Sequence, residues 1–412
     1  METIRSVLLR NACVLDPGRG ELVPGRAVLV RDGEIAAVGD DGLAADGAEV
    51  IDVRGQVLMP GLIDAHVHVT AYTADLAGGM EYSPSYVAAR AGRILSGMLD
   101  RGFTTVRDAA GADYGLAQAV EEGYLTGPRV LFGGKALSQT GGHGDDRPRG
   151  RDARDDAYCC PSHGRIVDGA DQVRRAVRDE IRRGADHIKL MLSGGVASPT
   201  DRVGSTQFSM EEISAAVEEA EAADRYVLGH AYTPRAINRG LRAGVRSIEH
   251  GNLIDETSVA LFRETGAFYV PTLVTYQALA EEGPAAGLPA ASHRKVFDVL
   301  DAGLHALELA HRGGVPIAYG TDLLGDMHRH QLREFTIRAG VQPPADIIRS
   351  ATTVAADLLK LAGRAGTIRE HALADLLVLD GNPLDDIAVL TDPGKHLKLI
   401  MHGGRIRKNT ME

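Results

Sequence analysis

Few residues of this sequence are aromatic and fewer still are cysteine, and these shortages exclude several kinds of protein. Tryptophan is absent, and aromatic residues make up only 4% of the 412 residues. Such a composition suggests neither a platform for stacking nucleic-acid bases nor an aromatic belt at a membrane interface. The three cysteines, Cys13, Cys159 and Cys160, are too few for a disulfide framework, and two adjacent thiols lack the spacing of a zinc site. We therefore expect a cytoplasmic protein with reduced thiols.

Long apolar runs and positive net charge are also missing. No stretch is apolar enough to span a membrane, and residues 1–6 lack the basic start of a signal peptide. The formal net charge is −11 at pH 7, which argues against nucleic acid and anionic membranes as partners. With 44% hydrophobic residues, the chain can build one large barrel domain or two to three smaller domains.

Short apolar runs separated by turns lie at both ends of the chain. Asp32 and Gly33 stand between two such runs near the N-terminus, and Asp-Gly is typical of a hairpin turn. Further strands are expected between residues 375 and 406. We predict a small β-sandwich domain that both ends build together, comprising residues 1–60 and 365–412.

Between these ends, short apolar runs alternate with longer helical stretches, so we predict an α/β fold. The runs expected to form strands are 61–66, 104–107, 130–132, 187–191, 226–230, 247–250, 268–271 and 317–320. The helical stretches include 210–223, 234–243 and 292–312. Eight such units over about 300 residues suit a (β/α)8 TIM barrel, here residues 61–364. The competing doubly wound open sheet lacks the support of a glycine-rich nucleotide loop.

One polar, charged stretch, residues 141–156, breaks this alternation. It follows the third predicted strand, on the side where barrel active sites are built. A lid over the site and a solvated surface loop are equally good interpretations.

The strongest local signal is the pair His66 and His68 at the end of the first predicted barrel strand. Residues i and i+2 of a strand point to the same side, so both imidazoles can approach one ion. Such a pair also occurs by chance, and its weight comes from the residues that accompany it.

Four later strands also carry residues that bind metals in proteins. They are Lys189, His230, His250 and Asp322, at or just after predicted strands four, five, six and eight. Taken singly, each histidine is more simply a hydrogen-bonded structural residue, and Asp322 a helix N-cap. Because all strands of a barrel open onto one mouth at their C-terminal ends, we predict that these side chains meet at one metal centre.

Lys189 requires its own explanation. Alternation along the fourth strand directs Leu190 and Leu192 outward and Lys189 into the barrel, where a charged amine is costly to bury. A neutral amine can add carbon dioxide to give a carbamate, whose two oxygens can bridge two cations. The alternative is a plain ion pair with Asp322 or another acid, but the neighbouring histidines favour the bridge.

This set of residues resembles the metal centre of the amidohydrolase superfamily. Three flanking words are similar as well: Met59-Pro60-Gly61-Leu62-Ile63-Asp64-Ala65-His66-Val67-His68, Ile248-Glu249-His250-Gly251 and Gly320-Thr321-Asp322. So is the split β domain, whose returning half starts near Gly366. Within the superfamily the chain is most similar to the imidazolonepropionase-like branch, which includes prolidase-like dipeptidases, carboxypeptidases that act on short peptides, and ochratoxinase.

The resemblance implies two divalent metal ions, with zinc as the first candidate and manganese or cobalt as others. By this resemblance, the more buried ion is held by His66, His68 and Asp322, and the other by His230 and His250. N6-carboxylated Lys189 and a hydroxide bridge the two ions.

The resemblance also implies a mechanism and further catalytic residues. The bridging hydroxide attacks the substrate carbonyl, and Asp322 carries its proton to the leaving amine. His143, in the loop after strand three, and Tyr232 help to stabilise the developing oxyanion. The plainer interpretations are a solvated loop histidine and a packing tyrosine. The arginines of the same loop are either ligands for a substrate carboxylate or solvated: Arg147, Arg149, Arg151 and Arg154.

The implied activity is hydrolysis of N-acyl amino acids or dipeptides at the amide bond, with ochratoxin-type amides as possible substrates. Hydrolases or deaminases of cyclic, carbamate or urea-type C–N bonds are the rival enzymes. A mononuclear deaminase would not need Lys189 and would show a glutamate shortly after His230, which is absent. A non-catalytic assembly protein would have lost metal ligands, whereas all six positions are filled. The branch further implies large symmetric homo-oligomers, with an octamer among them, and no partner besides a small-molecule substrate.

Overall fold

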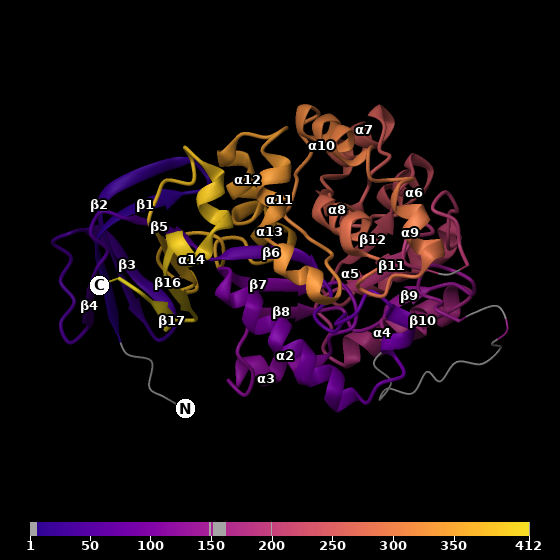
Figure 1. Cartoon of the computed structure of the whole chain (residues 1–412), viewed down its shortest axis with the longest axis horizontal. Coiled ribbons are helices and arrows are strands. Elements are labelled where there is room, and N and C mark those ends of the chain that lie inside the picture. The colour runs from indigo at the N-terminus through magenta and orange to yellow at the C-terminus, as the bar shows by residue number, and fades with distance from the viewer. Residues whose placement is uncertain (1–5, 148–149, 151–161, 199, 412) are drawn as a thin grey trace. The chain divides into compact units, whose positions relative to one another are not determined.

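The computed structural model of the protein describes residues 6–147, 150, 162–198 and 200–411 (Figure 1). The chain divides into two compact units. The first comprises Met1–Asp64, Gly97–Thr105 and Phe335–Glu412, and the second comprises Ala65–Ser96 and Val106–Glu334. No helix within the described residues is long and apolar enough to cross a membrane.

Strands from both ends of the chain form one mixed sheet in the first unit. They are β1 (Val7–Asp16), β2 (Glu21–Arg31), β3 (Glu34–Asp40), β4 (Glu49–Asp52), β5 (Val57–Pro60), β15 (Leu376–Leu379), β16 (Leu397–His402) and β17 (Arg405–Asn409). The order is β17-β16-β15-β5-β1-β2-β3, with β4 beside β1. The two ends meet where β15 runs antiparallel to β5. Figure 1 shows the indigo strands of the N-terminal end beside the yellow strands of the C-terminal end. A sheet built jointly by both ends is thus confirmed, while the sandwich and the boundaries 1–60 and 365–412 stay predictions.

The turn between β2 and β3 follows from its residues. Asp32 and Gly33 both adopt positive φ, 50° and 83°, and the flanking residues Arg31 and Glu34 are paired. Two positive φ angles match the right-handed twist of the strands, and Asp-Gly tolerates them at low cost. The inward side chains of this sheet, among them Leu9, Val28 and Val378, form one buried apolar cluster.

Parallel strands organise the remainder of the chain. They are β6 (Leu62–Val67), β7 (Phe103–Asp108), β8 (Arg129–Phe132), β9 (Ala136–Ser138), β10 (Gly164–Ile166), β11 (Ile188–Met191), β12 (Val227–Ala231), β13 (Ser247–His250) and β14 (Phe268–Val270). One sheet has the order β10-β9-β11-β12-β13-β14, in which all neighbouring strands are parallel, and the other has the order β6-β7-β8. Seven of the eight predicted barrel strands are therefore present.

The eighth predicted strand, residues 317–320, is reduced to a single bridge. Ile317 forms an isolated parallel bridge with Tyr269 of β14, and the carbonyl of Tyr319 accepts a 2.8 Å hydrogen bond from the amide of Ala65 in β6. The segment is short because Pro316 precedes it without an amide hydrogen, and because Asp322 turns the chain with φ 52°. Closure of a complete barrel over residues 61–364 stays a prediction.

Helices connect these strands. They are α1 (Leu76–Gly79), α2 (Pro84–Asp100), α3 (Tyr114–Glu121), α4 (Ala170–Arg182), α5 (Met210–Glu221), α6 (Pro234–Arg242), α7 (Glu256–Thr265), α8 (Leu273–Glu282), α9 (Ala290–Val296), α10 (Gly303–Arg312), η1 (Gly325–His330), α11 (Arg333–Arg338), α12 (Pro344–Ser350), α13 (Thr353–Leu358), η2 (Ile387–Thr391) and α14 (Pro393–His396). The helix expected over 210–223 starts at a complete capping box, in which Ser209 and Glu212 each accept the other's backbone amide.

The single helix expected over residues 292–312 is wrong, because α9 and α10 are separate helices. The side-chain amide of Asn252 donates a 3.0 Å hydrogen bond to the carbonyl of Val299, between the two helices. A Cβ on Gly303 would lie 2.7 Å from Leu273 Cδ2, so the chain passes too close to α8 for a side chain at the start of α10. Both contacts join segments that are far apart in the sequence, so the helical periodicity of residues 292–312 could not reveal them.

Several sequence predictions concern residues outside the described ranges. Half of the stretch proposed as a lid, 141–156, lies there, and so do Cys159 and Cys160. The same holds for Arg149, Arg151 and Arg154.

Leu192, just after β11, fills a space that two glycines leave open. A Cβ on Gly229 of β12 would lie 2.3 Å from Leu192 Cδ1, and one on Gly240 of α6 would lie 2.6 Å from the same atom. We predict that Gly229→Ala lowers the free energy of unfolding in urea by about 1–3 kcal/mol through overpacking. Adding Leu192→Ala removes the clash, so the double variant should lose less stability than the sum of the single variants. Simple additivity of the two losses would contradict this packing.

Candidate metal centre

The first three predicted ligands lie together at the end of β6. His66 and His68 point to one side of the strand, and Asp322 reaches them because its amide donates a 2.8 Å hydrogen bond to the carbonyl of His66. Oδ1 of Asp322 lies 3.2 Å from Nε2 of His68 and 3.5 Å from Nε2 of His66. One ligand atom from each residue lies within 4.8 Å of the others, so the group can hold a metal ion.

In three imidazoles, the Nδ1 atom forms a hydrogen bond that orients the ring. Nδ1 of His66 lies 2.6 Å from Glu249 Oε2, Nδ1 of His68 lies 2.7 Å from the carbonyl of Ala110, and Nδ1 of His250 lies 2.8 Å from Thr272 Oγ1. For His66 and His68 the partner is an acceptor, so Nδ1 carries a hydrogen and Nε2 is the nitrogen that faces Asp322. Nε2 is therefore the atom that each ring would offer to a metal ion.

Glu249 is itself held by a buried ion pair. Nη2 of Arg107 lies 2.9 Å from Glu249 Oε1, and both side chains are fully buried. Although burial opposes ionisation, the Arg107 guanidinium and the His66 ring hold the pKa of Glu249 below its usual range. Arg107 also donates to the carbonyl of Ala65 and to Ser247 Oγ. Neither residue was assigned a role from the sequence, although a charged residue inside the apolar run 104–107 was a usable signal.

Lys189 points inward from β11, and its whole residue is 1% exposed. Burial lowers the pKa of its amine to about 8, although the negative charges of Glu249 and Asp322 act to raise it. Among the described residues no hydrogen bond or ion pair engages this amine, so the plain ion pair with Asp322 is not formed. The amine thus spends a substantial fraction of its time neutral near pH 8.

His230 and His250 extend the row of imidazoles from the adjacent strands β12 and β13. Their ring centroids are 4.6 Å apart, and those of His250 and His66 are 5.0 Å apart. Burial lowers the pKa of both His230 and His250 well below the usual value, so both rings are neutral at pH 7. Nε2 of His230 lies 3.2 Å from the carbonyl of Gly194, which makes Nε2 the donor and leaves the lone pair on Nδ1.

His143 and Tyr232 lie against these two histidines. The ring of His143 stacks on that of His230 at 4.2 Å, and burial lowers the pKa of His143 to about 4. The ring of Tyr232 stacks on that of His250 at 5.5 Å, and burial raises the pKa of the Tyr232 hydroxyl. That hydroxyl lies 2.9 Å from the hydroxyl of Tyr276, a residue that sequence reasoning missed.

All eight predicted site residues line one cavity of about 80 Å³. They are His66, His68, His143, Lys189, His230, Tyr232, His250 and Asp322. Apolar side chains complete the wall, including Leu76, Met191, Leu279 and Leu324. Arg147 is absent from this lining and forms a 2.7 Å ion pair with Asp145. The chemical roles of the eight residues stay predictions.

Asp108, at the end of β7, is a further buried carboxylate that sequence reasoning missed. Its oxygens accept hydrogen bonds from the amides of Val69, at 2.7 Å, and Ala112, at 3.0 Å. Burial raises the pKa of Asp108 to about 6. These bonds tie the segment that follows His68 to the loop after β7, so Asp108 holds the backbone on which the first ligand pair stands.

Comparisons with known proteins cover nearly the whole chain. The sequence pattern of the amidohydrolase family matches residues 57–406. Ochratoxinase from Aspergillus niger is 36% identical over 422 residues, spanning 98% of this chain and 87% of that protein. A solved prolidase complexed with N-methylphosphonate-L-proline is 50% identical, with a TM-score of 0.95 over 98% of this chain and 100% of the prolidase. A Xaa-Pro dipeptidase structure with bound methionine is 29% identical, with a TM-score of 0.88 over 98% and 100% of the two chains.

We predict that Glu249→Gln weakens metal binding and stability together. The amide leaves Arg107 buried without its counter-charge, which should cost about 3–5 kcal/mol of unfolding free energy. It also weakens the acceptor for His66 Nδ1, so zinc affinity in a chelator competition should fall about 10- to 100-fold. Glu281→Gln is the matched control, because Glu281 pairs with Arg333 at an exposed site and should change stability by less than about 1 kcal/mol. Equal effects of the two substitutions would contradict the role given to Glu249.

Proposed function

Because the chain belongs to the amidohydrolase family, we propose that it uses two divalent metal ions to hydrolyse the amide bond of N-acyl amino acids or dipeptides. Family membership and its ochratoxinase and prolidase relatives make the protein a hydrolase of amide or peptide C–N bonds. The observation that carries the finer proposal is the single cavity shared by all six predicted ligands.

The donor set fits a pair of borderline-hard cations, with zinc as the first candidate. In this proposal His66, His68 and Asp322 hold one ion, and His230 and His250 hold the other. Lys189, N6-carboxylated, would bridge them. Its buried amine, with no ion-pair partner among the described side chains, supports that modification. When bound, the ions would polarise the substrate carbonyl and provide hydroxide near neutral pH.

Asp322 is the residue proposed to move the proton. Although burial opposes ionisation, the imidazoles of His66 and His68 hold the pKa of Asp322 well below its usual range. Its carboxylate is therefore ionised at neutral pH and can accept a proton from the attacking water. The same oxygen can then return that proton to the leaving amine, because both groups react within one cavity.

Tyr232 is proposed to donate a hydrogen bond to the developing oxyanion. Burial keeps the hydroxyl protonated. In this proposal the Tyr276 hydroxyl donates to the Tyr232 oxygen, which leaves the Tyr232 hydrogen for the oxyanion. A donor fixed in advance stabilises a transition-state charge without further reorganisation. His143 is proposed to act in the same cavity.

The chemistry of the cavity wall supports amides with apolar groups. Leu76, Leu279 and Leu324 offer hydrophobic contacts, and Tyr276 adds an aromatic face. Such a wall suits an apolar amino-acid side chain or an aryl acyl group, which includes ochratoxin-type amides.

We also propose that the parallel strands close into a (β/α)8 barrel over residues 61–364. The pairing of residues 317–320 with β14, and the hydrogen bond from Ala65 to Tyr319, support this closure. A β-sandwich of residues 1–60 and 365–412, a cytoplasmic location and a homo-oligomer such as an octamer complete the proposal.

The direct test is hydrolysis by zinc-loaded protein of a panel of N-acyl amino acids and dipeptides, followed by quantifying the released amino acid. We predict release from substrates with apolar side chains. Asp322→Asn should lower kcat by about 10²- to 10⁴-fold, the usual contribution of a general acid–base group. Release of ammonia from cyclic or aromatic amidines, with no cleavage of the panel, would instead favour a deaminase.

Carbamate formation at Lys189 should depend on pH in the metal-free protein. Only the neutral amine reacts with carbon dioxide, and the neutral fraction rises as pH increases through a pKa of about 8. We therefore predict that the carbamate signal from ¹³C-bicarbonate in an NMR spectrum grows between about pH 7 and pH 9. Lys189→Met is the control and should lack this signal. A signal that persists in the control, or falls as pH rises, would refute the assignment.

A further inference from the structure

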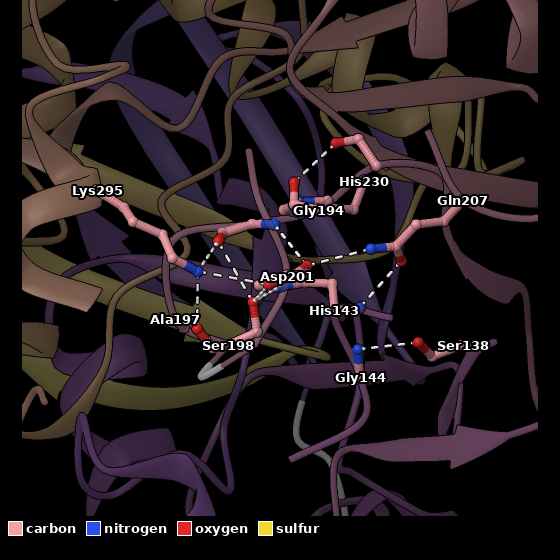
Figure 2. Close-up of polar contacts among 12 residues, drawn as sticks. Ser138, His143, Gly144, Gly194, Ala197, Ser198, Asp201, Gln207, His230 and Lys295 are labelled. Atoms are coloured by element: carbon pink, nitrogen blue, oxygen red, sulfur yellow. Dashed lines mark hydrogen bonds and ion pairs between the residues drawn. The ribbon is translucent and has the colours of Figure 1, made fainter. Parts of the chain in front are cut away.

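A buried carboxylate in the loop after β11 organises the contacts around His143 (Figure 2). The side chain of Asp201 is 3% exposed, and four donors surround it. The amide of Gly195 and Nε2 of Gln207 donate to Oδ2, at 3.0 and 3.1 Å. Ser198 Oγ donates to Oδ1, and Nζ of Lys295 lies 3.4 Å from the same oxygen. The position of this carboxylate is therefore fixed from both sides.

Lys295, in α9, holds the loop after β11 in place. Its ammonium donates to the carbonyls of Gly195, at 2.9 Å, and Ser198, at 2.8 Å, in addition to its contact with Asp201. Three acceptors use all three hydrogens of the ammonium. The loop is thus held by a cation from a segment about a hundred residues further along the chain.

The single hydroxyl hydrogen of Ser198 decides the polarity of the next contact. Nδ1 of His143 lies 2.8 Å from Ser198 Oγ. If Ser198 donated to His143, its lone pairs would face the carboxylate of Asp201 at close range, which is electrostatically unfavourable. Ser198 must therefore donate to Asp201 and accept from His143, so the Nδ1 atom of His143 carries a hydrogen.

The ring of His143 has little room to move away from Ser198. A Cβ on Gly195 would lie 2.0 Å from Cε1 of His143, so the ring rests directly on the loop backbone. The amide of His143 also donates a 2.9 Å hydrogen bond to Oε1 of Gln207, whose other side-chain atom contacts Asp201. Asp201 is therefore connected to the ring through Ser198 and to the backbone through Gln207.

We propose that Asp201 is a positioning residue that acts through Ser198 to keep a proton on Nδ1 of His143. Nε2 then becomes the only nitrogen of His143 that can gain or lose a proton, whatever the charge of the ring. A neutral His143 accepts a hydrogen bond at Nε2, and it can donate to an oxyanion only after Nε2 has taken up a proton. The catalytic consequence rests on the proposed function, whereas the hydrogen-bond chain does not.

Asp201→Asn should reverse this chain. The amide oxygen should occupy the place of Oδ2, where Gly195 and Gln207 donate, because at Oδ1 Ser198 can turn its hydrogen away and Lys295 keeps its two carbonyl acceptors. The amide NH2 then faces Ser198 Oγ and donates to it, which turns the serine hydrogen toward Nδ1 of His143. The ring proton should move to Nε2. Ser198→Ala removes the link altogether, and the preference for Nδ1 should disappear.

The test is a long-range ¹H–¹⁵N NMR spectrum of protein labelled at the histidine rings, with the His143 signals identified by their loss in His143→Gln. The wild type should show the proton on Nδ1, and Asp201→Asn should show it on Nε2. Gln207→Met is the matched control, because it cuts the backbone link but leaves the ring link intact, so Nδ1 should stay protonated. A wild-type ring protonated only at Nε2, or an unchanged pattern in both Asp201→Asn and Ser198→Ala, would overturn the proposal.

Kinetics with an amide substrate add a second readout. Asp201→Asn should lower kcat by about 10- to 100-fold, with a smaller change in KM, because Nε2 of the neutral ring then carries a hydrogen and can no longer accept one in the cavity. In the His143→Ala background the same substitution should have no further effect, because its only route to the substrate has been removed. Equal losses in both backgrounds would mean that Asp201 acts elsewhere. If no amide is hydrolysed at all, the proposed function fails, while the NMR result still decides the hydrogen-bond chain.

Discussion

The buried pair of Arg107 and Glu249 is the interaction on which the candidate site depends. Its Nη2–Oε1 distance is 2.9 Å, and neither side chain contacts solvent. Removing one partner would leave a bare charge in a medium that solvates it poorly, so the two must be kept or lost together. Because Glu249 also holds Nδ1 of His66, the ion pair fixes the direction of the first predicted ligand. Lys189 is a further buried group near this pair, and burial destabilises the charged form of its amine.

Around this pair the structure arranges imidazoles in a continuous row. His68, His66, His250, His230 and His143 follow one another with ring separations between 4.2 and 5.4 Å. Five such rings cannot all be charged at these distances, so the row is stable only if most of them are neutral. Neutral imidazoles and ionised carboxylates are the ligands that divalent cations select, and the metal-free arrangement is already close to that state.

The sequence predicted the parts of the site that depend on strand register. His66, His68, Lys189, His230 and His250 stand on or next to strands, and the alternation of side chains plus a common strand end sufficed to bring them together. Seven barrel strands and the terminal sheet were predictable for the same reason, since apolar runs report burial directly. Contacts made by side chains far apart in the sequence were not predictable: Arg107 with Glu249, Asp201 with Lys295, and Asn252 with Val299 depend on the packed fold. The division of the predicted 292–312 helix was missed on the same account.

In the proposed metal centre, six side chains from five segments of the chain hold two cations, and one of the six, a modified Lys189, lies between the ions. The most direct measurement is the metal content per chain of protein reconstituted with excess zinc and freed of unbound metal, determined by inductively coupled plasma mass spectrometry. The account predicts two zinc ions per chain in the wild type and fewer in Lys189→Met, which retains a side chain of similar length but cannot bridge. No more than one ion per wild-type chain, or two ions in both proteins, would contradict it.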